Sequence, residues 1–198
     1  MDSMILTKLQ NDIEESVDRY KSILAIPRKE ISLVQDLELV FKYVKDTQEL
    51  HINQFNERIM EDFGVSFNTA RNVRPVLERA NLLMKTKDNK IKLTTMAENY
   101  YKTKEIGYLT KGFIYNYFGF LEFLYLIQKK GPSRRKELIS DWVKLYENEY
   151  SKRITTTNLT QFSRIYTYLV GLDLIRLNNQ IIEMNDKHYL SLEKIEYW

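Results

Sequence analysis

Hydrophobic residues recur along the chain at the three- and four-residue spacing of amphipathic helices, and short polar segments separate the helical runs. The runs at residues 33–44, 55–63 and 68–80 each collect their apolar side chains on one face. Gly64 follows the second run directly, and Ser66 stands where it can cap the third. Because a glycine often ends a helix in the left-handed conformation and a serine caps the next one, this spacing predicts a tight helix-turn-helix.

Two short β-prone runs follow the third helical run. Leu82–Met84 and Ile91–Leu93 flank the polar segment Thr86–Lys90, in which Asp and Asn tolerate turn geometry, so we predict a β-hairpin. His51-Ile52 predicts a further short strand before the second helix. Pro75 stands inside the third helical run, where it removes a backbone donor and clashes with the preceding turn. We therefore expect a kink at Pro75 or a later helix start.

The same order of signals recurs in the second half of the chain. A helix over residues 113–127 and a helix over residues 138–145 precede a third helix and the turn Asn178–Gln180. We expect this third helix to bury Leu159, Phe162, Ile165, Tyr166 and Leu169 and to expose Thr160, Gln161, Arg164, Thr167 and Tyr168. Aligning the two third helices pairs Ala70 with Phe162, Val73 with Ile165 and Leu77 with Leu169. An internal repeat of this kind predicts two similar domains.

Each copy resembles a winged helix, which is a helix-turn-helix followed by a β-hairpin wing. The resemblance implies a mainly α fold with small β-hairpin wings, arranged as two winged-helix domains in tandem plus an N-terminal helix. On this basis residues 1–30 form the N-terminal helix, 31–105 the first winged-helix domain and 106–198 the second. Winged helices usually bind duplex DNA, so the resemblance also implies double-stranded DNA as a partner.

Two of the expected helices have apolar faces that must be buried against another surface. The pattern at Thr7–Ala25 gives one apolar stripe that stops before Pro27, and the 113–127 helix is aromatic or aliphatic around nearly its whole circumference. An apolar helix face has to be buried. Each helix either packs within the chain or forms an interface with a second copy or another protein.

Composition indicates the cellular location of the protein but says little about its function. The chain has 30 basic and 27 acidic side chains, a net charge of +3 and no cysteine, which excludes disulfides and Cys-ligated zinc. The first residues lack the apolar core of a secretory signal. The longest apolar stretch, residues 113–127, is shorter than a bilayer span and contains Asn116 and Glu122. We expect a cytoplasmic protein with no membrane segment.

Polar and basic side chains make up the candidate DNA-binding surface. Amide, hydroxyl and guanidinium groups on the outer faces of the third helices distinguish base pairs in the major groove, and lysines and arginines on neighbouring elements suit phosphates. The candidates are Asn68, Arg71, Asn72, Arg79, Lys85, Lys87, Lys90, Lys129, Lys130, Arg134, Arg135, Lys136, Thr160, Gln161 and Arg164. The competing interpretation is that these are ordinary solvent-facing polar surfaces.

The sequence gives little sign of catalysis. It contains no phosphate-binding glycine loop, no dinucleotide fingerprint, no zinc-protease motif and no nucleophile elbow. The two histidines, His51 and His188, lack metal-ligand spacing. Asp88-Asn-Lys90 has the D-x-K form of metal-dependent nucleases but is interpreted here as a hairpin turn. We expect no catalytic residues, no metal, no cofactor and a non-enzymatic protein.

Two functions from different classes fit these features. The first is a sequence-specific or structural double-stranded DNA-binding protein, with transcription regulation, replication and a mobile-element or defence accessory role all open. The second is a protein-protein interaction scaffold that resembles the tandem winged-helix subunits binding kleisins in bacterial chromosome-organising complexes. A DNA binder should show strongly salt-dependent affinity for DNA, and a scaffold should bind DNA weakly and expose an apolar patch.

Overall fold

The computed structural model describes residue 19 and residues 22–29, 32–47, 50–150 and 156–185. The chain divides into two compact units. The first unit is Ile23–Asn116, and the second unit joins Met1–Ser22 to Tyr117–Trp198. Most of the described residues are helical and each unit carries one small antiparallel sheet, so the predicted mainly α fold with small β-hairpins is confirmed.

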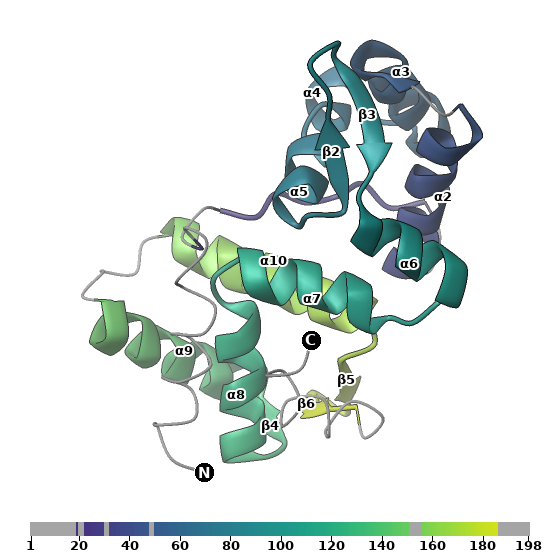
Figure 1. Cartoon of the computed structure of the whole chain (residues 1–198). Coiled ribbons are helices and arrows are strands. Elements are labelled where there is room, and N and C mark those ends of the chain that lie inside the picture. The colour runs from purple at the N-terminus through teal and green to yellow at the C-terminus, as the bar shows by residue number, and fades with distance from the viewer. Residues whose placement is uncertain (1–18, 20–21, 30–31, 48–49, 151–155, 186–198) are drawn as a thin grey trace. The chain divides into compact units, whose positions relative to one another are not determined.

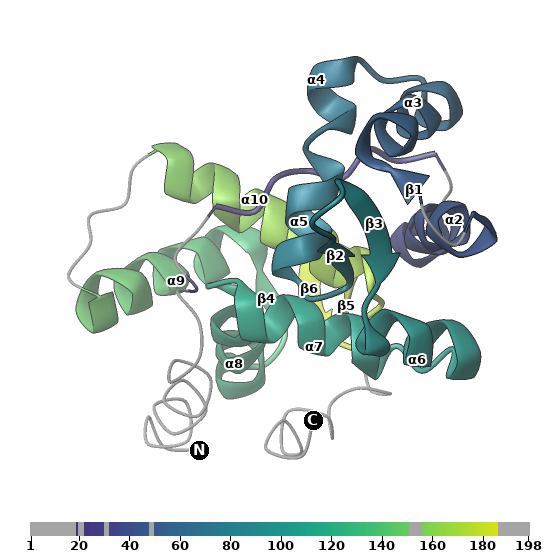
Figure 2. The same ribbon diagram turned by 45° about the horizontal axis from the view of Figure 1, so that its top comes forward.

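The first unit has a helical layer over a three-stranded sheet. Its elements in chain order are α2 (Leu33–Asp46), β1 (Leu50–His51), α3 (Ile52–Phe63), α4 (Phe67–Ala70), α5 (Val73–Arg79), β2 (Leu83–Lys85), β3 (Lys90–Leu93), α6 (Thr95–Thr103) and α7 (Gly107–Asn116). The sheet order is β1-β3-β2, so the short strand before α3 lies against the far edge of the hairpin (Figure 2).

The described part of the second unit repeats this order, with longer second and third helices. Its elements are α8 (Phe120–Lys130), β4 (Ser133–Arg134), α9 (Arg135–Tyr150), α10 (Thr156–Gly171), β5 (Ile175–Asn178) and β6 (Ile181–Met184), and its sheet order is β4-β6-β5 (Figure 1). Both predicted hairpins form, with Leu83 paired to Leu93 in the first unit and Ile175 paired to Met184 in the second.

Equivalent hydrogen bonds show that the repeat extends to the backbone. The Leu82 N–H donates to the Leu77 carbonyl at 2.8 Å, and the Leu174 N–H donates to the Leu169 carbonyl at 2.9 Å. The residues just before these donors, Asn81 and Asp173, both have positive φ, 55° and 58°. Helix and hairpin are therefore joined by the same turn in both units.

The aligned apolar pairs share one environment. Ala70, Val73 and Leu77 are 0% exposed, and their counterparts Phe162, Ile165 and Leu169 are at most 1% exposed. The larger Phe162 stands where the first unit has only a methyl group, and its ring packs against Phe123 and Trp142, with centroids 4.8 and 5.7 Å away. The three aligned positions of each third helix are therefore buried as predicted.

Pro75 has the effect expected from the sequence. The third helix of the first unit is divided into α4 and α5, and Pro75 is the third residue of α5. At this position the missing N–H falls among the donors that have no partner within the helix anyway. The later helix start therefore removes most of the cost of an internal proline.

The single helix predicted over residues 113–127 is wrong. The stretch is divided between α7 and α8, and Gly119 has a φ of 103° between them. The Glu122 carboxylate accepts the Gly119 N–H at 2.8 Å and so stabilises a helix start at Phe120. The break also falls where the chain passes from one compact unit to the other.

The predicted N-terminal helix lies mostly outside the described residues. Residues 7–18, 20 and 21 of that prediction are not described, and its last residues, Ser22–Ala25, are not helical. In the described segment 22–29, Ile23 and Ile26 are 1% and 5% exposed.

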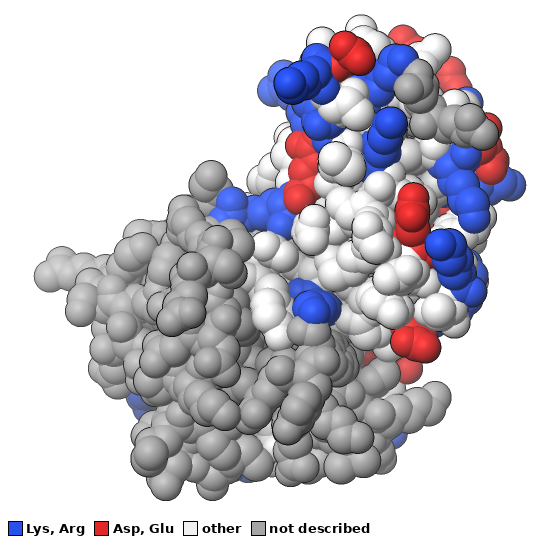
Figure 3. Space-filling view, viewed as in Figure 1, with Lys and Arg blue, Asp and Glu red and all other residues white. Residues whose placement is uncertain are grey.

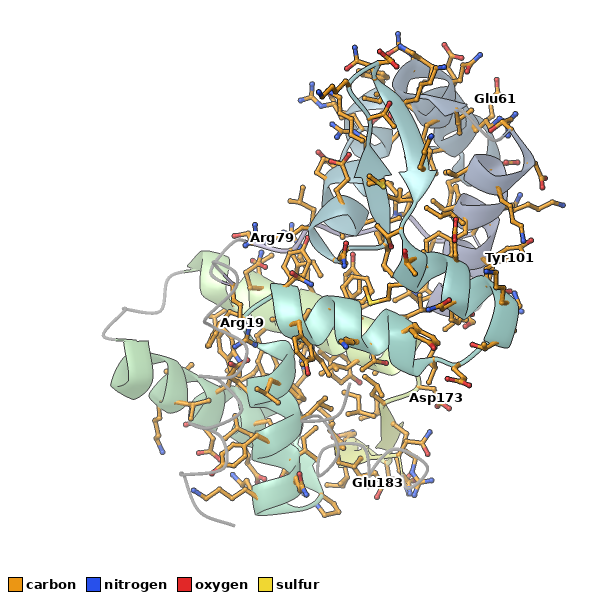
Figure 4. All side chains as sticks on the ribbon, in the orientation of Figure 1. Arg19, Glu61, Arg79, Tyr101, Asp173 and Glu183 are labelled. Carbon is orange, nitrogen blue, oxygen red and sulfur yellow. The ribbon has the colours of Figure 1, made fainter. Side chains whose placement is uncertain are left out.

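Arg19 and Arg28 each bind a buried carboxylate in the first turn of a helix, α8 and α2 respectively. The Glu122 side chain is fully buried and accepts from Arg19 at 2.9 Å, and Asp36 is fully buried and accepts from Arg28 at 2.6 Å. Figure 4 shows the labelled Arg19 side chain beside α8. A desolvated carboxylate needs such a partner, because burying an unpaired charge is costly.

The two glycines with positive φ at Gly64 and Gly119 allow a matched test of packing. An alanine Cβ at Gly64 meets nothing within 4 Å, whereas at Gly119 it would clash with the δ-methyl of the buried Ile165. We expect Gly64→Ala to cost about 1–2 kcal/mol of unfolding free energy through backbone strain alone. Gly119→Ala should cost about 1–3 kcal/mol more because the core is overpacked. Urea denaturation measures both, and equal losses would contradict the predicted clash.

The buried and the exposed ion pairs of the second unit should differ in strength. Arg19→Met leaves the buried Glu122 carboxylate without its cation, and we expect a loss of about 3–5 kcal/mol. The control Lys130→Met breaks the pair with Asp141, whose side chains are 37% and 30% exposed, and should cost about 1 kcal/mol or less. The comparison uses urea midpoints of the two variants, and a loss at Arg19 no larger than at Lys130 would contradict it.

Candidate nucleic-acid interface

The turn between α3 and α4 has the geometry that its sequence predicts. Gly64 ends α3 in the left-handed conformation, with φ 61°, and its N–H donates to the Met60 carbonyl. The Ser66 side chain accepts the Thr69 N–H at 3.4 Å and caps α4. The short strand predicted at His51-Ile52 lies one residue earlier, at Leu50–His51, and the His51 side chain caps α3. His51 therefore has a structural role at a helix start.

The outward residues of α4 and α5 differ in how free they are to meet a ligand. Asn68 and Arg71 are exposed and Asn72 is half-buried. Arg79 is also half-buried, and its Nε donates to the Asn116 carbonyl at 3.1 Å (Figure 4). Arg79 thus ties the end of α5 to the end of α7 within the first unit, which gives this arginine a structural role that the sequence did not reveal.

The hairpin of the first unit presents a basic turn. Thr86 and Lys90 close it through the Thr86 N–H, which donates to the Lys90 carbonyl at 2.8 Å. Lys85 and Lys87 are exposed, Lys90 is half-buried, and Asp88 is exposed between them. Both ribbon views place this turn toward the same end of the unit as α4 (Figures 1 and 2). Figure 3 shows lysines and arginines gathered at that end, with fewer acidic side chains among them.

The basic cluster of the second unit runs over residues 129–136, from the end of α8 through β4 to the start of α9. Lys129 lies over the Tyr125 ring, 5.8 Å from its centroid, and Lys130 is paired with Asp141 at 2.5 Å. Arg134 and Lys136 are exposed. The predicted concentration of charge at the α9 N-terminus is present, and part of it is neutralised by Asp141.

Arg135 connects this cluster to α10. Its guanidinium donates to the Ser163 hydroxyl at 2.8 Å and lies over the Tyr166 ring, 5.5 Å from the centroid. The sequence placed Arg135 among the phosphate-binding candidates without its partner on α10, because nothing local to either segment links them. The contact brings a cation to the outer side of the third helix of the second unit.

The exposed side of α10 differs from the predicted one at two positions. Thr160 is exposed and Gln161 and Arg164 are half-buried. Leu159, predicted inward, is 43% exposed, and Tyr168, predicted outward, is 4% exposed. The Tyr168 ring packs edge-on against Phe120, with centroids 6.0 Å apart. The Phe120 ring of α8 therefore covers Tyr168, and the buried face of α10 includes Tyr168 and excludes Leu159.

Phe67 is a surface residue that the sequence reasoning passed over. It is the first residue of α4 and is 50% exposed, next to the exposed Asn68. The sequence did contain a signal for this position, because a Ser66 cap makes Phe67 the first residue of the helix. An aromatic side chain thus lies among the polar groups of the candidate interface.

Two tyrosines of the first unit have displaced pKa values. Burial raises the pKa of Tyr43 above the usual tyrosine range, and the hydrogen bond to the Asp62 carboxylate adds to the shift. Burial also raises the pKa of Tyr100, followed by the hydrogen bond that its hydroxyl donates to Glu38 at 2.9 Å. Both hydroxyls stay protonated at neutral pH, so they act as structural donors and not as bases.

A groove of about 420 Å³ lies between α2, β3 and α6 of the first unit. Its lining combines lysines with apolar and aromatic surface, and consists of Val44, Lys45, Lys92, Leu93, Glu98, Tyr101 and Lys102. Lys45 lies over the Tyr101 ring at 3.9 Å from the centroid. Within the described ranges, no set of three or more His, Cys, Asp or Glu side chains is placed to hold a metal ion.

No described helix is both long enough and apolar enough to cross a membrane.

Comparison with known proteins gives a likeness in structure without one in sequence. No protein-family model matches the chain, and no curated protein does. The fold is similar to that of the BpuJ1 endonuclease binding domain, solved in complex with pyrene- and phenanthrene-modified DNA. The TM-score is 0.53 at 13% sequence identity, and the match covers 91% of this chain and 87% of the other. The likeness spans both compact units and concerns the fold.

The different environments of two arginines lead to a stability prediction. Arg79→Ala removes the hydrogen bond to the Asn116 carbonyl and should lower the free energy of unfolding by about 1 kcal/mol. The matched control Arg71→Ala changes an exposed side chain and should stay within about 0.5 kcal/mol of the unmodified protein. Urea denaturation distinguishes them. The structural role of Arg79 is refuted if the two variants are equally stable.

Proposed function

We propose that this protein is a non-enzymatic double-stranded DNA-binding protein built from two winged helices. In each unit the order is helix, strand, helix, third helix and hairpin, with the third helix of the first unit divided into α4 and α5. In each unit the short strand pairs with the second strand of the hairpin. This order and pairing are those of a winged helix, and they support the tandem arrangement for which residues 31–105 and 106–198 were delimited.

The observation that carries the proposal is the likeness to the BpuJ1 endonuclease binding domain, which covers 91% of this chain. That domain was solved in complex with DNA. A fold alone does not establish a function, so the proposal also rests on the surface chemistry. Exposed Asn68 and Arg71 beside an exposed basic hairpin turn form a combination suited to base edges and phosphates.

The two units would make different contacts with DNA. In the first unit, Asn68 on α4 and Arg71 at its C-cap would contact the major groove, while Lys85 and Lys87 neutralise phosphates. In the second unit Thr160, Gln161 and Arg164 occupy the corresponding helix, and Arg134, Arg135 and Lys136 stand at the start of α9, where the helix dipole favours an anion. Regulation of transcription, replication and a mobile-element or defence role all remain within this proposal.

The test is the salt dependence of binding to a random-sequence duplex, measured by fluorescence anisotropy. Each neutralised phosphate adds about −0.9 to the slope of log affinity against log salt concentration, so Lys85→Ala with Lys87→Ala should make the slope shallower by about two. The matched control Lys42→Ala alters an exposed lysine on α2, away from the hairpin, and should leave the slope unchanged.

The result also separates DNA binding from the scaffold function. A protein scaffold would bind duplex DNA weakly and with a slope that the hairpin lysines do not affect. Weak binding of the unmodified protein at low salt would therefore overturn the proposal. Binding to a second copy or to another protein would then be the function to pursue.

A further inference from the structure

The internal repeat places two exposed apolar side chains at one equivalent position. The alignment that pairs Ala70 with Phe162 also pairs Phe67 with Leu159. Phe67 is 50% exposed and Leu159 is 43% exposed. Each is followed directly by an exposed polar residue, Asn68 in one unit and Thr160 in the other.

This equivalence sets the pair apart from the other exposed apolar residues. Five large hydrophobic side chains are exposed in the described part of the chain, and the other three are Met84, Val170 and Leu177. The repeat pairs these three with charged residues, namely Arg176, Glu78 and Lys85. Among these five residues, only Phe67 and Leu159 occupy a position that is apolar in both units.

The location restricts what such a side chain can meet. Both residues lie in the N-terminal part of the third helix, which is the part of a recognition helix that approaches base edges. In the major groove, the apolar group that a base edge presents is the 5-methyl of thymine, and side chains such as Ala, Thr and Phe contact it. Burial against that methyl removes apolar surface from water on both partners.

We propose that Phe67 and Leu159 each contact a thymine 5-methyl group in the major groove, one in each unit's binding site. This inference rests on the proposed DNA-binding function. The neighbouring Asn68 and Arg71, or Thr160 and Gln161, supply hydrogen bonds, and the apolar residue adds a preference for thymine at one position. The two units read thymine through equivalent positions although their polar residues differ.

The experiment compares one duplex library made with thymine and the same library made with deoxyuridine, which lacks the 5-methyl. The unmodified protein should bind the deoxyuridine library more weakly, by about four-fold for each methyl contact. The double variant Phe67→Ala with Leu159→Ala should bind the two libraries nearly equally, because the truncated side chains no longer reach methyl groups that Phe67 and Leu159 contact. Phe67→Leu with an unchanged Leu159 keeps an apolar side chain and should retain most of the difference.

The control is a second double variant, Met84→Ala with Leu177→Ala. It also removes one exposed apolar side chain from each unit, away from the third helices. It should preserve the discrimination between thymine and deoxyuridine. Urea denaturation should show both double variants close to the unmodified protein in stability, because all four residues are exposed.

Different failures point to different proposals. If the unmodified protein binds neither library, both the DNA-binding function and this inference fall. If it binds both libraries equally well, or if the Phe67 and Leu159 variant still discriminates between them, only the methyl contact is refuted. If the Phe67 and Leu159 variant bends DNA less than the unmodified protein does but still discriminates between the libraries, these side chains insert between bases. That result would also overturn the methyl contact.

Discussion

The fold of each unit depends on one residue in the left-handed conformation directly after the third helix. Asn81 and Asp173 hold this conformation, and in each case the next N–H turns back to the carbonyl five residues earlier. Asn and Asp adopt positive φ at lower cost than other side chains, which explains why two different residues form the same turn. The turn fixes the direction in which the hairpin leaves the helix. The second hairpin strand then ends in a further common bond, from Thr94 to the Leu82 carbonyl and from Asn185 to the Leu174 carbonyl.

On this common frame the two units carry different surfaces. The first unit has a divided third helix and a hairpin turn with exposed lysines, so part of its positive charge lies at the tip of the hairpin. The second unit has one continuous third helix and an uncharged turn at Asn179-Gln180. Its basic cluster runs over residues 129–136, where Asp141 binds Lys130 and Ser163 binds Arg135. A duplicated frame with unequal surfaces is expected where two halves contribute differently to one binding partner.

Local chemistry explains which features the sequence could predict. The Gly64 and Ser66 turn, both hairpins and the aligned buried positions depend on a few neighbouring residues, and all are confirmed. The errors arise where a helix cap or a contact with another helix overrides helical periodicity. Gly119 divides the aromatic stretch because Glu122 caps a new helix there, and Tyr168 turns inward because the Phe120 ring lies beside it. Neither outcome can be obtained from helical periodicity, since an apolar or aromatic residue on a boundary suits both faces.

Arg19 gives the second unit an unusual order of assembly. The segment that ends at Ser22 belongs to the same compact unit as Tyr117–Trp198, so the first unit is inserted within the second along the chain. During synthesis all of Ile23–Asn116 is made after Arg19 and before Glu122. Domains generally fold as units, so the chain of the first unit is complete before the second unit can form this ion pair. The buried ion pair therefore joins two segments of the second unit that are made before and after the whole of the first unit.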